Sequence, residues 1–288
     1  VAMNSNQSAS YASLPLANAR KLGLLDHAEA SAGEPFRGGK FNATFRGDDL
    51  KFMQFLIPPG KRILELGCGR GDLLAGLQPS YGVGVDFSPK TVARAKGLYP
   101  HLTFVLGDAE DSAALGSIEG PFDYIVISDT IGMFEDIDGT LRLVHRLCEP
   151  STRIIVSYHS HLWEPVLRLG ELLGLRNRQP QVNYIATVDF LNLMDLADFE
   201  VIRQEQRQLI PMNWFGLGPL VNRYVAPLPG IRRLCLRTYL VGRPVGLLPD
   251  RKLSASIVIP CRNERGNIEH AIQRMPRFAS RQEIIFVE

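Results

Sequence analysis

Four acidic side chains stand in or directly after short apolar segments in the first half of the chain. They are Glu65 in "ILELGCGRG", Asp86 in "GVGVDF", Asp108 in "FVLGDAE" and Asp129 in "IVISD". If these segments form parallel strands of one sheet, their carboxyl ends meet at one edge, where open α/β sheets bind their ligands. The four acids therefore predict a site whose carboxylates accept hydrogen bonds from hydroxyl and amino groups of a ligand.

Glycines follow the first of these segments with the spacing G-x-G-x-G, at Gly67, Gly69 and Gly71, and Asp72 opens the helix expected next. Glycine allows a sharp turn and lets the backbone approach a ligand closely. A dinucleotide site has the spacing G-x-G-x-x-G and holds a pyrophosphate at the helix N-terminus, where the Asp72 carboxylate would repel it. A zwitterionic ligand whose amino and carboxylate groups meet the loop near Glu65 therefore fits better. A tight turn with packing glycines is the simpler alternative.

The next acids suggest the rest of such a ligand. Asp86 can accept hydrogen bonds from both hydroxyls of a ribose, although it could instead cap the helix that follows. Asp108 can accept from the amino group of an adenine while Ala109 offers its backbone N–H; the alternative is an ordinary loop acid. Asp129 would lie close to a second substrate.

The elements that must position these residues alternate between apolar strand patterns and amphipathic helix patterns. This alternation indicates a parallel sheet covered by helices on both faces. Strands are expected over residues 61–66, 81–87, 102–108, 122–129, 152–159, 199–206 and 234–242. Helices are expected over residues 47–56, 72–77, 88–99, 138–148 and 187–197.

Taken in order, "LELGCGRG", "VGVDFS", "LGDAED" and "FDYIVISD" resemble the four motifs of class I S-adenosylmethionine-dependent methyltransferases. The resemblance covers about residues 45–245. It implies a Rossmann-like α/β fold with a seven-stranded, mostly parallel sheet, whose seventh strand ("LCLRTYLVG") is antiparallel between the fifth and sixth. It implies S-adenosylmethionine as cofactor and S-adenosylhomocysteine as product. The predicted cofactor-binding residues are Glu65, Gly67, Cys68, Gly69, Gly71, Asp86, Phe87, Asp108, Ala109, Glu110 and Ser128.

The segment "SYHSHLWEP" follows the fifth expected strand, on the ligand side of the sheet. Histidine suits proton transfer near neutral pH, and methyl transfer needs a base only when the nucleophile must lose a proton. The predicted catalytic residues are His159, His161, Tyr158 and Asp129. The simpler alternative is that one histidine caps a helix and the other is solvated. A metal site is not expected, because the two histidines lack a third clustered ligand.

Residues 209–237 mix large apolar side chains, prolines and arginines before the last strand. They could form a lid over the acceptor. They could also lie on an anionic membrane surface, with Trp214, Phe215 and Leu217 buried in it and arginines on the headgroups. An ordinary packed excursion is the third reading. Residues 203–252 hold nine Lys or Arg against two acids, but the whole chain has a net charge of only +2, so nucleic acid is not an expected partner.

Bulk features place the protein in the cytoplasm, with peripheral membrane contact left open. The four cysteines are far apart and form no CxxC pair, which argues against a disulfide framework. No apolar run approaches the ~18 residues of a spanning helix, and the N-terminus has no secretory signal pattern. Residues 1–45 are predicted to be a polar leader followed by helical pieces and loops. A homodimer is not excluded.

The last residues, "SIVIPCRNERGNIEHAI…EIIFVE", read as strand, helix and strand. They resemble the start of family 2 glycosyltransferases of the polyprenyl-phosphate type, through Pro260, Asn263 and Glu264, with Glu288 where the second strand meets its first acid. The predicted domains are a methyltransferase at 46–245, a linker at 246–253 and a glycosyltransferase-like fragment at 254–288. This fragment is expected to be truncated and unable to transfer sugar.

The predicted function is methyl transfer to an oxygen or nitrogen of a small or lipid-linked acceptor, such as a glycan- or polyprenyl-linked one. The alternatives are a non-catalytic cofactor-binding module that positions a glycosyltransferase, and a nicotinamide-dependent enzyme.

Overall fold

The computed structural model describes residues 19–31, 39–172, 183, 185–211, 213, 216–247, 254–262 and 265–287. The chain divides into two compact units, Val1–Gly246 and Leu247–Glu288, and each is described by itself. Some residues used in the sequence predictions lie outside the described ones. They are residues 1–18, most of the expected linker, Trp214, Phe215, Asn263, Glu264 and Glu288.

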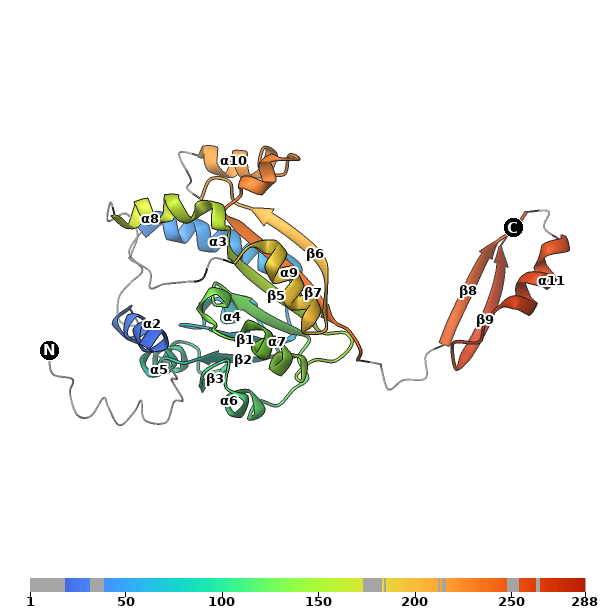
Figure 1. The fold of residues 1–288 in the computed structure, drawn as a ribbon, viewed down its shortest axis with the longest axis horizontal. Coiled ribbons are helices and arrows are strands. Elements are labelled where there is room, and N and C mark those ends of the chain that lie inside the picture. Colours follow the sequence, from blue (N-terminus) through green and yellow to red (C-terminus); the bar gives the residue numbers. More distant parts are fainter. Residues whose placement is uncertain are drawn as a thin grey trace. The chain divides into compact units, whose positions relative to one another are not determined.

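The first unit is built on a seven-stranded sheet with the strand order β3-β2-β1-β4-β5-β7-β6. Its strands are β1 (Arg62–Leu66), β2 (Tyr81–Asp86), β3 (Thr103–Leu106), β4 (Tyr124–Ser128), β5 (Arg153–His159), β6 (Phe199–Arg207) and β7 (Arg237–Pro244). β7 runs antiparallel to both of its neighbours, β5 and β6, and the other pairs are parallel. The predicted fold class is confirmed, including the place of the antiparallel strand (Figure 1).

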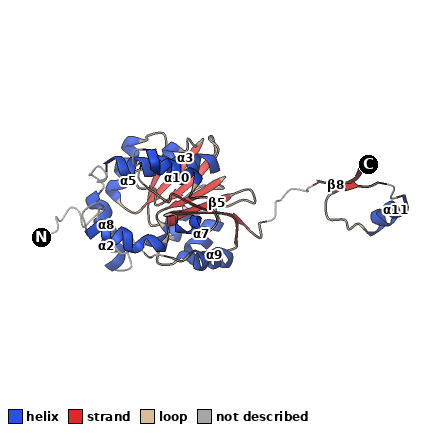
Figure 2. Ribbon diagram, turned by 90° about the horizontal axis from the view of Figure 1, so that it is seen from above, coloured by secondary structure: helices blue, strands red, loops and turns tan. Residues whose placement is uncertain are grey.

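Helices cover both faces of this sheet (Figure 2). The longer ones are α2 (Ala19–Ser31), α3 (Gly39–Leu56), α5 (Pro89–Leu98), α7 (Ile137–His145), α8 (Glu164–Leu172), α9 (Thr187–Leu196) and α10 (Leu217–Tyr224). Two five-residue helices, α4 (Asp72–Gly76) and α6 (Ser112–Gly116), follow β1 and β3. Successive strand residues alternate between the faces, so Ile63 packs with α3, α4 and α5 while Leu64 packs with α7 and α9.

α3 begins well before the predicted helix at residue 47, so the predicted domain boundary at residue 46 falls inside it. The start was predicted from Asp48 or Asp49 as a helix cap, but both acids lie inside α3, and so does Gly47, although glycine in a helix interior costs about 1 kcal/mol. The helix nevertheless continues through Gly47, because Phe45 and Asp49 on either side of it both make long-range contacts that hold the helix. Tertiary packing therefore outweighs the local propensity at this position.

The second unit is a parallel strand pair, β8 (Ser254–Pro260) and β9 (Arg281–Val287), joined by α11 (Arg265–Arg274). The strand–helix–strand pattern read from the sequence is therefore present. Its assignment to a glycosyltransferase remains a prediction. Across the described residues of both units, no helix combines the length and apolarity needed to span a membrane.

Candidate active site

The glycine turn after β1 adopts a left-handed backbone that few other residues tolerate. Gly67, Gly69 and Gly71 have φ of 71°, 53° and 78°. A Cβ at Gly67 would lie 2.2 Å from the side chain of Thr130, so that glycine is required for close packing. A Cβ at Gly69 would meet no atom within 4 Å, so the backbone there is open to a ligand.

Cys68, between these glycines, points away from the open side of the turn. Its side chain is buried, and its sulfur lies in the core where Gly84 leaves room for it. Its backbone N–H donates to Val85 O. Cys68 therefore shapes the turn, and its thiol is not placed to contact a cofactor.

Glu65 is a buried carboxylate with an incomplete set of partners. It is 3% exposed, and its Oε2 has no hydrogen-bond partner within the described residues. Burial raises the pKa of this carboxyl well above its ordinary value of 4.5. A buried unpaired carboxylate is costly, and a ligand ammonium group would relieve that cost. This orphaned oxygen fits the methionyl amino group of S-adenosylmethionine.

Asp86 stands at the end of β2 and holds the glycine turn in place. One carboxylate oxygen accepts from Gly69 N–H at 2.9 Å, and the other accepts from Ser88 N–H at 3.0 Å. Burial raises the pKa of Asp86, and these two hydrogen bonds oppose the rise. A carboxylate offers about four acceptor positions, so two remain for ribose hydroxyls. The predicted cap role is not seen, because Ser88 caps α5 by accepting from Thr91 N–H.

A cavity opens beside this edge of the sheet. Its lining includes the predicted residues Gly67, Phe87, Asp108, Ala109 and Glu110. Thr130, Met133 and Phe134 from the segment after β4 complete one wall, and Lys21 and Leu24 from α2 complete another. The expected adenine-binding residues are therefore gathered around one cavity.

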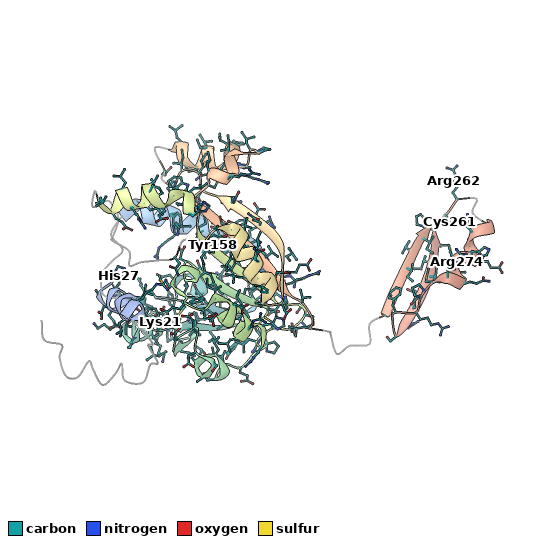
Figure 3. All side chains as sticks on the ribbon, in the orientation of Figure 1. Lys21, His27, Tyr158, Cys261, Arg262 and Arg274 are labelled. Carbon is teal, nitrogen blue, oxygen red and sulfur yellow. The ribbon has the colours of Figure 1, made fainter. Side chains whose placement is uncertain are left out.

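The sequence did not predict the part played by α2. Lys21, which lies on this helix (Figure 3), forms ion pairs with both Asp108 and Glu110. Burial favours the neutral amine of Lys21, but the two carboxylates outweigh it and raise its pKa. On the same helix, Glu29 accepts from Ser88 Oγ at 2.6 Å. α2 is therefore held against the segments that follow β2 and β3, at the edge of the sheet where the cofactor is expected.

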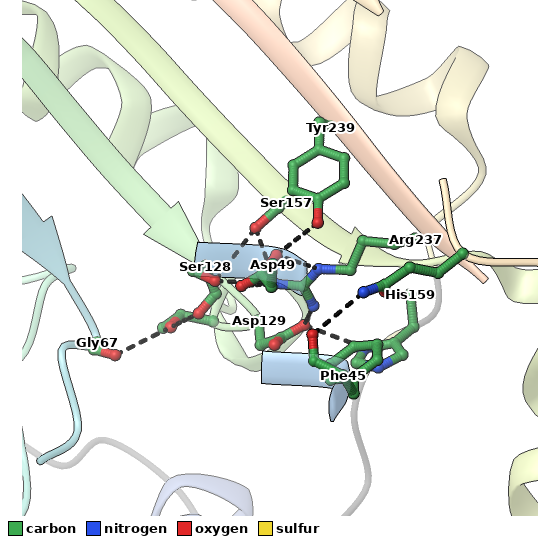
Figure 4. A network of polar contacts seen from close by, with 11 residues as sticks. Phe45, Asp49, Gly67, Ser128, Asp129, Ser157, His159, Arg237 and Tyr239 are labelled. Atoms are coloured by element: carbon green, nitrogen blue, oxygen red, sulfur yellow. Dashed lines mark hydrogen bonds and ion pairs between the residues drawn. The ribbon is translucent and has the colours of Figure 1, made fainter. Parts of the chain in front are cut away.

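A second cluster of polar residues lies on the α3 face of the sheet, at the ends of β4 and β5 (Figure 4). At its centre is Arg237, the first residue of β7, which is 0% exposed. Its guanidinium bonds two carboxylates and two hydroxyls, from three other elements. The partners are Asp49 on α3 (Nε to Oδ1, 3.1 Å), Asp129, Ser128 Oγ (3.0 Å) and Ser157 Oγ (3.1 Å).

Asp129 joins this cluster to His159. His159 Nδ1 lies 3.1 Å from Asp129 Oδ1, and its ring stacks on Phe45 with 5.7 Å between centroids. An ionised carboxylate only accepts hydrogen bonds, so in the neutral imidazole Nδ1 carries the hydrogen and Nε2 holds the lone pair. Asp129 has φ of 58°, a left-handed conformation that is costly outside glycine and often marks functional sites.

Burial alone would raise the pKa of Asp129, but its attraction to Arg237 and His159 outweighs burial and holds that pKa well below its usual range. The carboxylate therefore stays ionised. Thr130 connects this cluster to the cofactor turn, because its hydroxyl donates to Ser128 O at 3.0 Å and lies 3.4 Å from Gly67 O.

The structure separates the other predicted catalytic residues from this pair. Tyr158 points to the opposite face of the sheet, where its hydroxyl donates to Thr187 Oγ1 at 3.0 Å and its ring packs on Phe190. Its assignment as catalytic is wrong, because neighbouring residues on a strand face opposite sides. His161 is exposed at the start of the short helix η2 (His161–Trp163). The hydroxyl of Ser128, predicted to bind the cofactor, instead bonds Arg237 and Ser157. It therefore belongs to the polar cluster around Arg237 and not to the lining of the cavity.

Arg237, Asp49 and Tyr239 belong to this cluster and were not predicted from the sequence. Tyr239 donates to Asp49 Oδ1 at 2.5 Å. The sequence contained one signal for this cluster. Arg237 stands inside an otherwise apolar predicted strand, and an arginine is rarely buried without a charged partner. No group of three metal-ligating side chains is found among the described residues.

A family model described as "Methyltransferase domain" matches residues 41–204, which is more than half of the chain. The chain belongs to this methyltransferase family. The matched span contains the glycine turn, Asp86, Asp108 and the Asp129–His159 pair. The prediction of an S-adenosylmethionine-dependent methyltransferase is therefore confirmed at the level of the family, and the nicotinamide alternative is set aside.

Similar proteins agree with this assignment. An uncharacterized methyltransferase of Synechocystis is 32% identical over 170 residues, covering 55% of this chain and 76% of that protein. Two solved structures share the fold with a TM-score of 0.52. One is an S-adenosylmethionine-dependent methyltransferase of Thermotoga maritima described as a possible histamine N-methyltransferase, with 18% identity over 70% of this chain and 91% of its own. The other is the magnesium protoporphyrin IX methyltransferase of Synechocystis with bound S-adenosylhomocysteine, with 15% identity over 78% and 99%.

Replacing Asp86 with Asn is expected to weaken S-adenosylhomocysteine binding by about 10-fold or more, about 1.4 kcal/mol. Both carboxylate oxygens accept N–H groups, so the amide would turn its own N–H₂ toward one of these donors. Calorimetric titration measures the change. Asp111→Asn is the control, because this half-buried acid caps α6 by accepting from Ala113 N–H, away from the glycine turn. Wild-type affinity in Asp86→Asn would refute the assigned ribose contact.

Proposed function

We propose that this methyltransferase acts on a hydroxyl oxygen or a nitrogen of a small or lipid-linked acceptor, and that His159 accepts the acceptor's proton. The observation that carries this proposal is the 3.1 Å contact between His159 Nδ1 and Asp129 Oδ1 at the carboxyl end of the sheet. The carboxylate fixes the ring and leaves Nε2 as a proton acceptor. This is the arrangement by which a carboxylate supports a histidine base in other enzymes.

S-adenosylmethionine, when bound, supplies a methyl group on a positively charged sulfur. The acceptor's lone pair forms the new bond to the methyl carbon, and the electron pair of the broken carbon–sulfur bond stays on sulfur. The proton of the acceptor passes to Nε2 of His159. Asp129 stabilises the resulting imidazolium, since one negative charge lies 3.1 Å from Nδ1.

Glu65, Asp86 and Asp108 with Ala109 would hold the methionyl amino group, the ribose and the adenine. The orphaned Glu65 oxygen, the remaining acceptor positions of Asp86 and the lining of the cavity support these roles. The Asp108 carboxylate would be shared between the adenine amino group and Lys21. Positioning of this kind contributes to rate because it aligns the nucleophile with the methyl group.

Two features favour a lipid-linked acceptor. The sequence of residues 254–287 resembles the start of polyprenyl-phosphate glycosyltransferases, which would place glycan- or polyprenyl-linked intermediates close to this unit. Exposed apolar side chains also cluster in the segments that flank His159, among them Leu162 and Leu234. A glycosyltransferase linked to the methyltransferase remains part of the proposal.

The test is S-adenosylhomocysteine formation by the full chain with three acceptor sets: short alcohols and phenols, amines, and polyprenyl-phosphate-linked sugars. Product formation is expected with an acceptor that carries O–H or N–H, and mass spectrometry should find the new methyl group on that oxygen or nitrogen. Methylation of carbon would refute the proposed role of His159 as the acceptor's base. Turnover of the water-soluble acceptors with none of the lipid-linked ones would refute the lipid-linked class.

A further inference from the structure

Large apolar side chains are exposed unevenly over the first unit. Seventeen are exposed among its described residues, and nine of them lie in two segments, 162–172 and 217–234. Single exposed leucines are ordinary on protein surfaces, but a concentration of them marks an interaction surface. These two segments therefore differ from the rest of the surface.

The segment 217–234 forms the connection between β6 and β7. β6 runs parallel to β5, so this connection emerges at the carboxyl edge of the sheet, beside His159. Figure 1 shows β6 leading to α10. The short helix η4 (Ile231–Leu234) closes the connection, and Leu234 O accepts from Trp163 Nε1 at 2.7 Å. This bond ties the connection to the segment that follows His159.

α10 has an inner and an outer apolar face. Gly218 is buried on the inner side, as is Ala226 just after the helix, and Asn222 fixes the helix by two hydrogen bonds to the backbone of Ile210, at 2.8 and 2.9 Å. The outer side chains follow helical spacing and continue into the turn and η4. They are Leu217 (58% exposed), Leu220 (55%), Tyr224 (62%), Leu228 (47%) and Leu234 (55%), and together they are called the α10 face.

The charged residues within the segment 217–234 have one sign. Arg223, Arg232 and Arg233 are exposed, and none of them forms a salt bridge with another described residue. The sequence has no Asp or Glu between Glu205 and Asp250. A solvated protein surface usually mixes both signs, whereas unpaired arginines around exposed leucines match the apolar interior and anionic headgroups of a bilayer surface.

We propose that the α10 face docks the methyltransferase on an anionic membrane surface. The leucines and Tyr224 enter the boundary between headgroups and acyl chains, and the three arginines contact the lipid phosphates. Because the connection starts and ends at the carboxyl edge, docking places the His159 side of the sheet toward the bilayer. This inference concerns membrane binding itself and does not depend on the identity of the acceptor.

The test is co-sedimentation of the full chain with vesicles of phosphatidylcholine alone and of phosphatidylcholine mixed with an equal amount of phosphatidylglycerol. The wild type is expected to sediment with the anionic vesicles only. Leu217→Ser/Leu220→Ser should weaken this binding by at least about 10-fold. Arg232→Gln and Arg233→Gln should each weaken it about 5-fold.

Matched controls lie on other elements. Leu98→Ser/Leu196→Ser changes two leucines exposed on α5 and α9, and Lys96→Gln removes an exposed cation on α5. Neither should change vesicle binding. Three results would overturn the proposal: a folded wild type that stays in solution with both vesicles, equal losses in the controls, or arginine variants that weaken binding while the leucine variant does not. A fourth is a dimer in sedimentation equilibrium that Leu217→Ser/Leu220→Ser dissociates without any vesicle binding, since the face would then belong to a second copy.

Discussion

Replacing His159 with Gln is expected to lower the rate of methyl transfer by about 10²–10⁴-fold, which is the usual contribution of a positioned base. S-adenosylhomocysteine affinity should stay within about 3-fold of the wild type, because His159 contacts Asp129 and Phe45 rather than the cofactor cavity. Single-turnover kinetics gives the rate, and calorimetric titration gives the affinity. The two measurements separate a defect in proton transfer from a defect in cofactor binding.

His161→Gln is the matched control, because it makes the same substitution two residues away at an exposed position. It should leave the rate unchanged. Equal rate losses in the two variants, or a full rate in His159→Gln, would show that His159 is not the base.

Replacing Arg237 with Met is expected to lower the free energy of unfolding by about 3–5 kcal/mol. The change removes a fully buried cation and leaves the buried carboxylate of Asp49 without its main partner, while Asp129, whose side chain is 42% exposed, loses its ion pair at a more open position. Methionine fills a similar volume, so the loss reports the missing charge rather than a cavity. Urea unfolding followed by circular dichroism measures the difference.

Arg243→Met is the control, because Arg243 lies on the same strand and pairs with one carboxylate, Glu200, at an exposed position. It should cost about 1 kcal/mol or less. Adding Asp49→Asn and Asp129→Asn to Arg237→Met should recover part of the lost stability, because the uncompensated charges are then removed. A loss from Arg237→Met as small as that of Arg243→Met would contradict the central role given to this guanidinium.

The effect of Arg237→Met should also depend on pH. The native pKa of Asp129 is held below its ordinary value of 3.8, so ionised Asp129 stabilises the wild type above that value. This contribution disappears as the pH falls through the native pKa. The difference between wild type and variant is therefore largest near neutral pH and shrinks in acid.

The cofactor side of the site could be predicted from sequence because its residues follow local rules. Glu65, Asp86 and Asp108 lie on or just after consecutive strands, and parallel strands bring their carboxyl ends to one edge. The glycine spacing likewise reports a backbone conformation that is set within a few residues. The structure bears out both inferences about geometry, although it turns Cys68 and Ser128 away from the cavity.

The acceptor side could be predicted only in part. Asp129 and His159 were predicted from their positions at the ends of strands, but the cluster around Asp129 depends on the contact between Asp49 and Arg237, which are 188 positions apart. No local pattern encodes such a contact. Tyr158 was chosen wrongly because the sequence shows that it neighbours His159, whereas the pleat of the strand separates them. Lys21 was missed because α2 has little periodic pattern and gains its place by pairing with Asp108 and Glu110.

The position of β7 between β5 and β6 sets an order for the assembly of the newly made chain. Among the described strands β6 lies at the sheet edge and pairs with β7 alone, so it has no place in the sheet until β7 has been synthesised. The strands that carry the cofactor turn, β1 to β5, can already pair with one another by then. The cofactor side of the site can therefore form during translation. The cluster on the acceptor side needs Arg237, the first residue of β7, so it is completed only when the end of this unit emerges from the ribosome.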